Sequence, residues 1–260
     1  MAADSGVKTE LLADGGVLRI LIDAGKGNIL TRAVMEGIRA ALDQHANDPA
    51  LRMVFLRGAN GHFSFGASVP EHKKDEAPGM LRSFHALARA VYAYPVPVVS
   101  LVEGKCLGGA LELVACGHLV FCTANAAFAC PEIKLGVFPP VLAALGAQRL
   151  GAPLAERMVM TGAEIDAKQA LAAGFVTDLV DGDPEEALMK WYKGNLHGLS
   201  AFSLRQATLA VRTDSGAVDA FTDALAAAEK RYLGPLLHSQ DGNEGIEAFL
   251  AKRAPAWRHA

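Results

Sequence analysis

The sequence has few cysteines, and none of them is arranged like a metal site. No two of the four form a C-x-x-C pair, and no histidine stands near them at zinc-site spacing, so no metal is predicted. We expect them to be reduced core residues. A nucleophilic Cys106 beside Lys105 is an alternative that the pattern leaves open. The four are Cys106, Cys116, Cys122 and Cys130.

A strong charge of either sign is also missing, and so are long apolar runs. The formal net charge is −3, which gives no electrostatic footprint for nucleic acid or for an anionic membrane. No run reaches the roughly 18 apolar residues of a membrane span. The first residues, MAADSGVKTELL, lack the apolar region of a signal peptide. We therefore expect a cytoplasmic protein whose partners include neither nucleic acid nor a membrane.

What the chain does have is a large apolar fraction in an alternating pattern. Hydrophobic residues make up 51% of the sequence, enough for one large domain or a core with a smaller appendage. Strand and helix patterns alternate as far as about residue 195, and beyond it the pattern is helical, so we predict an α/β fold with core 1–195 and helical lobe 196–260. Strands are predicted at 17–22, 52–58, 98–102, 118–122 and 175–180, and helices at 31–45, 80–93, 108–117, 153–160, 166–173, 184–196, 200–213, 217–232 and 242–252.

Residues 98–132 form the stretch most suited to chemistry. Its predicted helix is apolar almost all round and should be buried, yet it carries Glu112 in its middle. Glu132 follows another apolar run, and two buried carboxyl groups with raised pKa values can divide acid and base roles. The alternative is structural: Glu112 pairs with a nearby base, and Glu132 caps a turn.

Glycines at the entry of this helix add a second requirement for catalysis. The first N–H groups of a helix have no intrahelical partner, and Gly108 and Gly109 let a substrate oxygen approach them closely. Such donors can hold a developing oxyanion, although close packing of helix on strand explains the pair equally well. The loop FSFGAS (63–68) is small and apolar, which suits the edge of a pocket. Residues 70–79 are expected to be mobile and exposed, and the histidines at 62, 72 and 85 to pack or to face solvent.

An ordered set of motifs along nearly the whole chain resembles the crotonase (enoyl-CoA hydratase/isomerase) superfamily. The motifs are KGNIL (26–30), FLRG (55–58), FSFGAS (63–68), VEGKCLGGALEL (102–113), FACPEIKLGVF (128–138), QRLG (148–151), TG (161–162), A-x-x-x-G-F-V (170–176) and EGIEAFLAKRAPAW (244–257). The resemblance implies a crotonase-type spiral of ββα units with a helical C-terminal lobe. It also implies assembly as a homotrimer or a dimer of trimers.

The same resemblance implies an acyl-CoA thioester as substrate and no separate cofactor, because CoA is part of the substrate. The thioester oxygen would be held by the backbone amides of Ala67 and Gly109. Glu112 would draw a proton from water, and Glu132 would exchange the proton at the α carbon. Further substrate contacts are expected from Phe65, Gly66, Gly108, Phe138, Phe249 and Lys252.

Two departures from the family pattern narrow the prediction. Ser68 stands where relatives carry an acidic residue, and PPVLAALGA (139–147) replaces a glycine-rich loop that borders the acyl pocket in relatives. We predict a loop that contains Pro139 and Pro140, followed by a short helix. Within the family, FGAS-V-x-EH (65–72) and EIKLGVF (132–138) are similar to cyclohexa-1,5-diene-1-carbonyl-CoA hydratases. A hydratase is therefore predicted. An isomerase or thioester hydrolase of the same fold, or a non-catalytic CoA-binding protein, are the alternatives.

Overall fold

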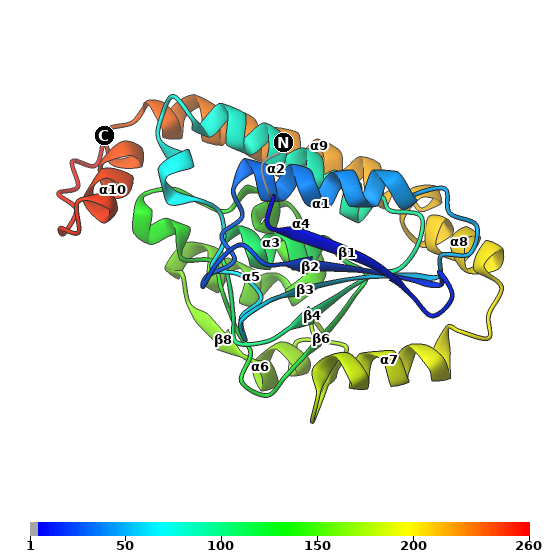
Figure 1. Cartoon of the computed structure of the whole chain (residues 1–260). Coiled ribbons are helices and arrows are strands. Elements are labelled where there is room, and N and C mark those ends of the chain that lie inside the picture. Colours follow the sequence, from blue (N-terminus) through cyan, green and yellow to red (C-terminus); the bar gives the residue numbers. More distant parts are fainter. Residues whose placement is uncertain (1–4) are drawn as a thin grey trace.

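The computed structural model describes residues 5–260 (Figure 1). The larger of its two sheets has the order β1-β2-β3-β4-β6-β9, in which β1 and β2 pair antiparallel and the later neighbours pair parallel. β3 and β4 are apolar and buried along nearly their whole length, as expected of parallel strands covered on both faces. The six strands are β1 (Val7–Leu12), β2 (Val17–Ile22), β3 (Met53–Gly58), β4 (Val98–Val102), β6 (Leu119–Cys122) and β9 (Asp178–Leu179).

A second, smaller sheet leads into the functional region. It consists of β5 (Lys105–Leu107), β7 (Ala127–Ala129) and β8 (Glu164–Asp166). β5 and β7 pair parallel, so the residues that follow each of them emerge at the same edge of this sheet. Those residues are Gly108, which opens a helix, and Cys130, which precedes Glu132.

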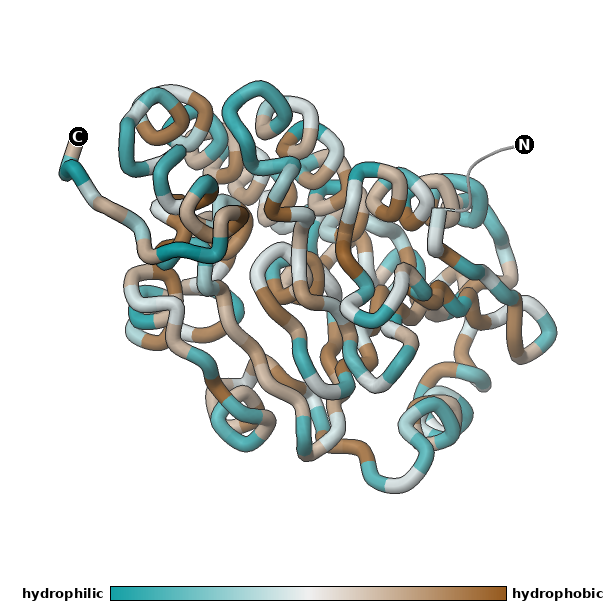
Figure 2. Tube along the Cα trace, turned by 60° about the vertical axis from the view of Figure 1, so that its left-hand side comes forward, coloured by the Kyte–Doolittle hydropathy of each residue, from teal (hydrophilic) through white to brown (hydrophobic). Residues whose placement is uncertain are grey.

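Helices cover both faces of the larger sheet. In Figure 1, α1, α2 and α9 lie above it and α7 lies below it, and Figure 2 shows hydrophobic segments running through the middle of the molecule. α1 begins where Thr31 accepts a hydrogen bond from the amide of Val34. The helices are α1 (Arg32–His45), α2 (Ala77–Tyr92), α3 (Gly109–Cys116), α4 (Pro140–Leu150), α5 (Ala152–Thr161), α6 (Ala167–Ala172), α7 (Pro184–Asn195), α8 (Ala201–Leu209), α9 (Ala217–Arg231) and α10 (Asp241–Leu250), with 3₁₀ turns η1 (Val69–His72) and η2 (Pro131–Leu135) and π-helical turns η3 (Ala210–Asp214) and η4 (Tyr232–Leu236).

Most predicted elements are confirmed, and several segments differ. No strand is predicted where β1, β5, β7 and β8 lie, and only Asp178–Leu179 of the predicted strand 175–180 is a strand. The segment 70–79, expected to be mobile, contains the end of η1 and the first turn of α2. The short helix predicted after Pro139 and Pro140 is confirmed as α4, but it begins at Pro140 and so leaves a shorter loop than predicted. Proline suits the first helical position, and the next amides find a side-chain acceptor.

The C-terminal helices pack on the core and share its interior. Phe221, Leu225 and Tyr232 belong to the same buried cluster as the apolar side chains of α2, α3 and α4. The division at residue 195 and the role of the lobe in assembly stay predictions, since a single chain does not test them. Among the described residues, no helix has the length and apolar character needed to cross a bilayer.

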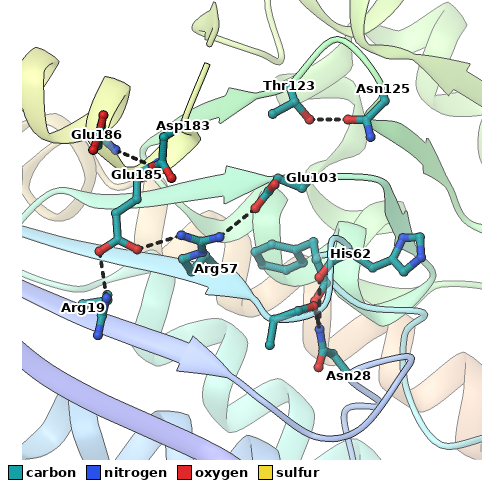
Figure 3. A network of polar contacts seen from close by, with 12 residues as sticks. Arg19, Asn28, Arg57, His62, Glu103, Thr123, Asn125, Asp183, Glu185 and Glu186 are labelled. Atoms are coloured by element: carbon teal, nitrogen blue, oxygen red, sulfur yellow. Dashed lines mark hydrogen bonds and ion pairs between the residues drawn. The ribbon is translucent and has the colours of Figure 1, made fainter. Parts of the chain in front are cut away.

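An ion-pair network ties α7 to the larger sheet on the face opposite α1 and α2 (Figure 3). Glu185 accepts hydrogen bonds from Arg19 at 2.8 Å and from Arg57 at 2.7 Å, and Arg57 also donates to Glu103 at 2.8 Å. Nearby, the Asn28 side-chain amide donates to the carbonyls of Ala59 at 2.8 Å and His62 at 3.0 Å. These bonds explain the asparagine of the KGNIL motif: it holds the chain that leads into FSFGAS.

Candidate active site

A small cavity brings together five of the predicted site residues. Its volume of about 20 Å³ is room for about one water molecule. The second sheet positions two of these residues, because Gly109 follows β5 and Glu132 follows β7. The predicted residues that line it are Ala67, Gly109, Glu112, Glu132 and Phe138, and the remaining lining residues are His72, Met80, Leu81, Phe84, Pro140 and Tyr232.

Glu112 is held by a helix end and not by a cation. Its side chain is buried in the middle of α3, and its Oε1 accepts hydrogen bonds from the amides of Val141 at 2.6 Å and Leu142 at 3.0 Å. These amides lie in the first turn of α4, where N–H groups lack intrahelical partners and the helix dipole favours negative charge. The alternative in which Glu112 pairs with a nearby base is therefore wrong for this chain, whose described residues form no ion pair with it.

Glu132 reaches the cavity because Gly108 has no side chain. A Cβ atom added at Gly108 would lie 2.5 Å from Glu132 Oε1, and Gly108 has a φ of +55°, which favours glycine. The other oxygen, Oε2, is buried and has no hydrogen-bond partner among the described residues. Glu132 thus presents an unsatisfied oxygen in the cavity that Glu112 also lines.

Burial raises the pKa values of both carboxyl groups, and the further causes differ between them. Burial raises the pKa of Glu112 to about 7, and the two α4 amides oppose this rise by stabilising the ionised form. Burial and then the charge of Glu112 raise the pKa of Glu132 to about 8. Two α4 amides favour the ionised form of Glu112, whereas only its own backbone amide does so for Glu132, so this difference favours the proton on Glu132. Such an asymmetry suits a pair that divides acid and base roles.

The backbone at Ala67 lies close to the backbone at Gly109 beside this pair. A Cβ atom added at Gly66 would lie 3.4 Å from the Gly109 nitrogen, and one added at Gly109 would lie 3.5 Å from the Ala67 nitrogen. Within the described residues, neither the Ala67 amide nor the Gly109 amide donates a hydrogen bond. Two unused amides close together at the wall of a cavity are candidate donors to an oxyanion.

The surrounding chain fixes these amides by hydrogen bonds of its own. The Leu30 amide donates to the Gly66 carbonyl at 2.9 Å, and the Gly66 amide donates to the Ser64 hydroxyl at 3.0 Å. The Gly108 amide donates to the Ala129 carbonyl at 2.7 Å. Both loops that carry the free amides are therefore anchored one residue before the amide itself.

Three predicted substrate residues lie away from the cavity. Phe65 is 41% exposed and meets the His62 ring edge-on at 5.0 Å between centroids. Phe249, 55% exposed, and Lys252 lie at the C-terminal end of α10 and do not line the cavity. Gly66 and Gly108 shape the backbone around it. The single chain does not test the predicted substrate contacts of these residues.

Sequence reasoning missed Tyr232 and did not assign His72 to the site. Tyr232 comes from the far end of α9, so no local pattern connects it with residues 67–138. The His72 ring nitrogen Nδ1 lies 2.9 Å from the Ser68 carbonyl oxygen. His72 ends the turn η1, in a segment that was predicted to be mobile. Ser68, the departure from the family pattern, therefore still has a bonding partner through its backbone.

A larger cavity and the cysteines do not compete with this site. The larger cavity, about 630 Å³, lies beside α7 and α8, and none of the predicted site residues lines it. Burial raises the pKa of the Cys106 thiol well above its usual range, so the nucleophilic thiolate is disfavoured. All four cysteines are free and buried, as expected of small core residues.

A family model, curated proteins and solved structures each match nearly the whole chain. A family model described as enoyl-CoA hydratase/isomerase matches residues 13–260. Cyclohexa-1,5-dienecarbonyl-CoA hydratase of Thauera aromatica is 41% identical over 257 residues, which cover 99% of this chain and 98% of that protein. Carnitinyl-CoA dehydratase of Salmonella typhi is 29% identical over 95% of this chain and 97% of its own. The crystal structure of an enoyl-CoA hydratase from Mycobacterium avium subsp. paratuberculosis K-10 superposes with a TM-score of 0.83 at 30% identity, covering 97% of this chain and 98% of that one.

Proposed function

The chain belongs to the enoyl-CoA hydratase/isomerase family, and from that premise we propose that it adds water across a double bond conjugated to a CoA thioester. The predicted α/β fold of the crotonase type is confirmed by the family match and by the similar solved structure. One observation carries the proposed reaction: two buried carboxyl groups without a cation share a cavity with two unused amides. Each of these groups has a defined task in hydration.

The proposed reaction moves two protons and forms one carbon–oxygen bond. Ionised Glu112 accepts a proton from water while the water oxygen bonds to the β carbon, and the electron pair of the double bond moves to the thioester oxygen. The amides of Ala67 and Gly109 stabilise that enolate oxygen, a contribution of about 2.7–4 kcal/mol for each donor. Protonated Glu132 then gives its proton to the α carbon and restores the thioester. Proton exchange between the two carboxyl groups or with solvent resets the pair.

A cyclic dienoyl-CoA is the substrate class that we favour over a linear enoyl-CoA. The relative named cyclohexa-1,5-dienecarbonyl-CoA hydratase is 41% identical over nearly all of this chain. Phe84, Phe138 and Tyr232 line the cavity, and their rings suit contact with a flat ring; because the cavity has room for about one water molecule, a cyclic acyl group requires it to widen. Pro140, the first residue of α4, lines the same cavity.

A spectrophotometric assay tests this proposal. The loss of the absorbance of the conjugated thioester is followed with crotonyl-CoA and with cyclohexa-1,5-diene-1-carbonyl-CoA, and the products are analysed. We expect hydration, faster with the cyclic thioester, and a fall of about 10²- to 10⁴-fold in kcat for Glu112→Gln and for Glu132→Gln. A shifted double bond would favour an isomerase and free CoA a thioester hydrolase. Undiminished turnover by both variants would overturn the mechanism.

We also propose that the protein works as a homotrimer or a dimer of trimers. Several large apolar side chains are exposed on and beside α8, and an assembled lobe would cover such a surface. Phe249 and Lys252, at the end of α10, would then meet the acyl or CoA portion of the substrate across a subunit boundary. Light scattering after size-exclusion chromatography distinguishes the two assemblies from a monomer. The apolar residues are Leu199, Phe202 and Val211.

A further inference from the structure

Tyr232 brings a polar group from the C-terminal lobe into the carboxylate cavity. Its side chain is 1% exposed and lines the cavity together with Glu112 and Glu132. It opens the π-helical turn η4, where Gly234 leaves helical geometry with φ −87° and ψ −105°. Its ring contacts that of Phe138 at 5.6 Å between centroids. The kink and the ring contact together fix where the hydroxyl is presented.

The Tyr232 hydroxyl is buried and has no hydrogen-bond partner among the described residues. An unsatisfied buried hydroxyl is costly, and Glu132, which lines the same cavity, also has an unsatisfied buried atom, Oε2. Burial, followed by the charges of Glu132 and Glu112, raises the pKa of Tyr232, so its hydroxyl stays protonated and can donate. A water molecule in the cavity, which has room for about one, would satisfy these groups together.

The other polar side chain that the sequence did not assign to the cavity cannot take the same role. Burial lowers the pKa of His72, which keeps the ring neutral. Its Nδ1 proton is used in the hydrogen bond to the Ser68 carbonyl, so the remaining ring nitrogen is an acceptor. Of these two side chains, only Tyr232 can donate a hydrogen bond into the cavity while keeping its proton throughout the proposed reaction.

We propose that Tyr232 positions the nucleophilic water by donating a hydrogen bond to it, an inference that rests on the proposed hydration. Water has two protons and two lone pairs. Glu112 accepts one proton and an oxygen of Glu132 accepts the other. Tyr232 donates to one lone pair and leaves the second directed at the β carbon of the thioester. Tyr232 keeps its own proton throughout, and the atom and electron balance of the hydration is unchanged.

Tyr232→Phe removes the hydroxyl and keeps the ring, and two reactions separate its role from that of the other groups. The first is hydration of the preferred thioester under saturating conditions. The second is exchange of the α proton of a saturated acyl-CoA such as butyryl-CoA with D₂O, which needs Glu132 and the oxyanion amides but no water at the β carbon. Tyr192→Phe is the matched control, because Tyr192 is also fully buried but packs in the other core cluster.

We expect kcat for hydration to fall about 10- to 100-fold in Tyr232→Phe, the scale of one lost hydrogen bond to a reacting group, with KM nearly unchanged. The α-proton exchange should stay near the wild-type rate, and the control should match the wild type in both reactions. If the wild type hydrates and Tyr232→Phe is as fast, or if hydration and exchange fall together, the water-positioning role is overturned while the proposed function stands. A wild type that hydrates no thioester would end both.

Discussion

Two groups of glutamates in this protein have opposite surroundings. Glu103 and Glu185 lie in the network of Figure 3, at hydrogen-bond distance from Arg57, and Glu185 also bonds Arg19. Their side chains are about one-fifth exposed. Glu112 and Glu132 line a closed cavity that contains no lysine or arginine. Both groups lie partly or fully inside the protein, but only the second is buried without a cation, which raises the pKa values of its carboxyl groups.

The difference lies in what replaces water around each carboxylate. The network glutamates bond guanidinium groups, and these ion pairs connect α7 with the larger sheet and serve structure. The amides at the start of α4 stabilise ionised Glu112 but do not outweigh the effect of its burial. The buried Oε2 atom of Glu132 has no donor among the described residues. The absence of a cation around this pair among the described residues is what makes an acid and a base available. Stability and activity should therefore respond oppositely to changes in the two groups.

The largest expected effect comes from the carboxyl groups of the cavity. Glu112→Gln and Glu132→Gln should each lower kcat by about 10²- to 10⁴-fold, because each removes one proton-transfer group. Their melting temperatures should equal or exceed that of the wild type at neutral pH. Glu103→Gln should do the reverse, with kcat near the wild-type value and a lower melting temperature. Equal losses of activity in all three variants would erase the distinction between the two groups.

Gly108→Ala should have the next largest effect on activity. The added Cβ would overlap Glu132 Oε1 at 2.5 Å, and the carboxyl group is the flexible partner that must move. A displacement on the order of 1 Å can cost about 100-fold in rate. Steady-state kinetics measure this loss.

Gly182→Ala is the control for the backbone conformation. Gly182 also has a positive φ, +74°, but a Cβ there meets nothing within 4 Å. It should share the strain of Gly108→Ala without the loss of rate. A control that is equally slow would show that backbone strain, not the Glu132 carboxyl group, governs the effect.

The pH dependence of stability should distinguish the cavity acids from an ordinary surface acid. The pKa of Glu132 is raised in the folded state, so the folded protein binds the proton more tightly than the unfolded chain does. Stability therefore falls as pH rises from the ordinary carboxyl range through the raised pKa. Glu132→Gln should match the wild type near pH 5 and exceed its free energy of unfolding near pH 8.5 by about 1–3 kcal/mol.

Denaturant unfolding at the two pH values measures that gap. Glu164→Gln is the control, because the Glu164 side chain is half exposed and paired with Lys105. Glu164→Gln should show no gain in the free energy of unfolding over the wild type that grows with pH. If the difference in the free energy of unfolding between Glu132→Gln and the wild type is the same at both pH values, the raised pKa is contradicted.

The smallest predicted effect concerns the ion-pair network. Arg57→Met leaves Glu103 without its partner and Glu185 with Arg19 alone. Because these side chains are partly buried, the free energy of unfolding should fall by about 1–2 kcal/mol. The value of kcat should stay close to that of the wild type. A loss of activity without a loss of stability would show that the network acts on the site.

The sequence predicted the parts of the site that lie close together in the chain. Gly109 and Glu112 share one short helix, and Glu132 follows a strand paired with the strand before that helix, so local pattern and the family resemblance place them together. Two features required the fold. Pro139 and Pro140 suggested a loop, yet α4 begins there because Glu112, distant in sequence, accepts its first free amides.

Tyr232 was beyond sequence reasoning for a similar reason. It closes a predicted tail helix whose apolar pattern gives no sign that one side chain reaches a cavity formed by residues 67–140. Its position depends on the π-helical turn and on the kink at Gly234, which precedes Pro235. This pair indicates a break in the helix but not the cavity that Tyr232 lines. The spacing of apolar residues along the chain does not predict such a contact.

The most direct test is a ¹³C NMR titration of the glutamate side-chain carboxyl carbons, with signals assigned through Glu112→Gln and Glu132→Gln. We predict two signals that titrate far above the usual carboxyl range and are coupled to each other. In Glu132→Gln the Glu112 signal should titrate at lower pH than in the wild type, and in Glu112→Gln the same should hold for Glu132. Two independent titrations in the ordinary carboxyl range would contradict a cation-free pair that shares one proton.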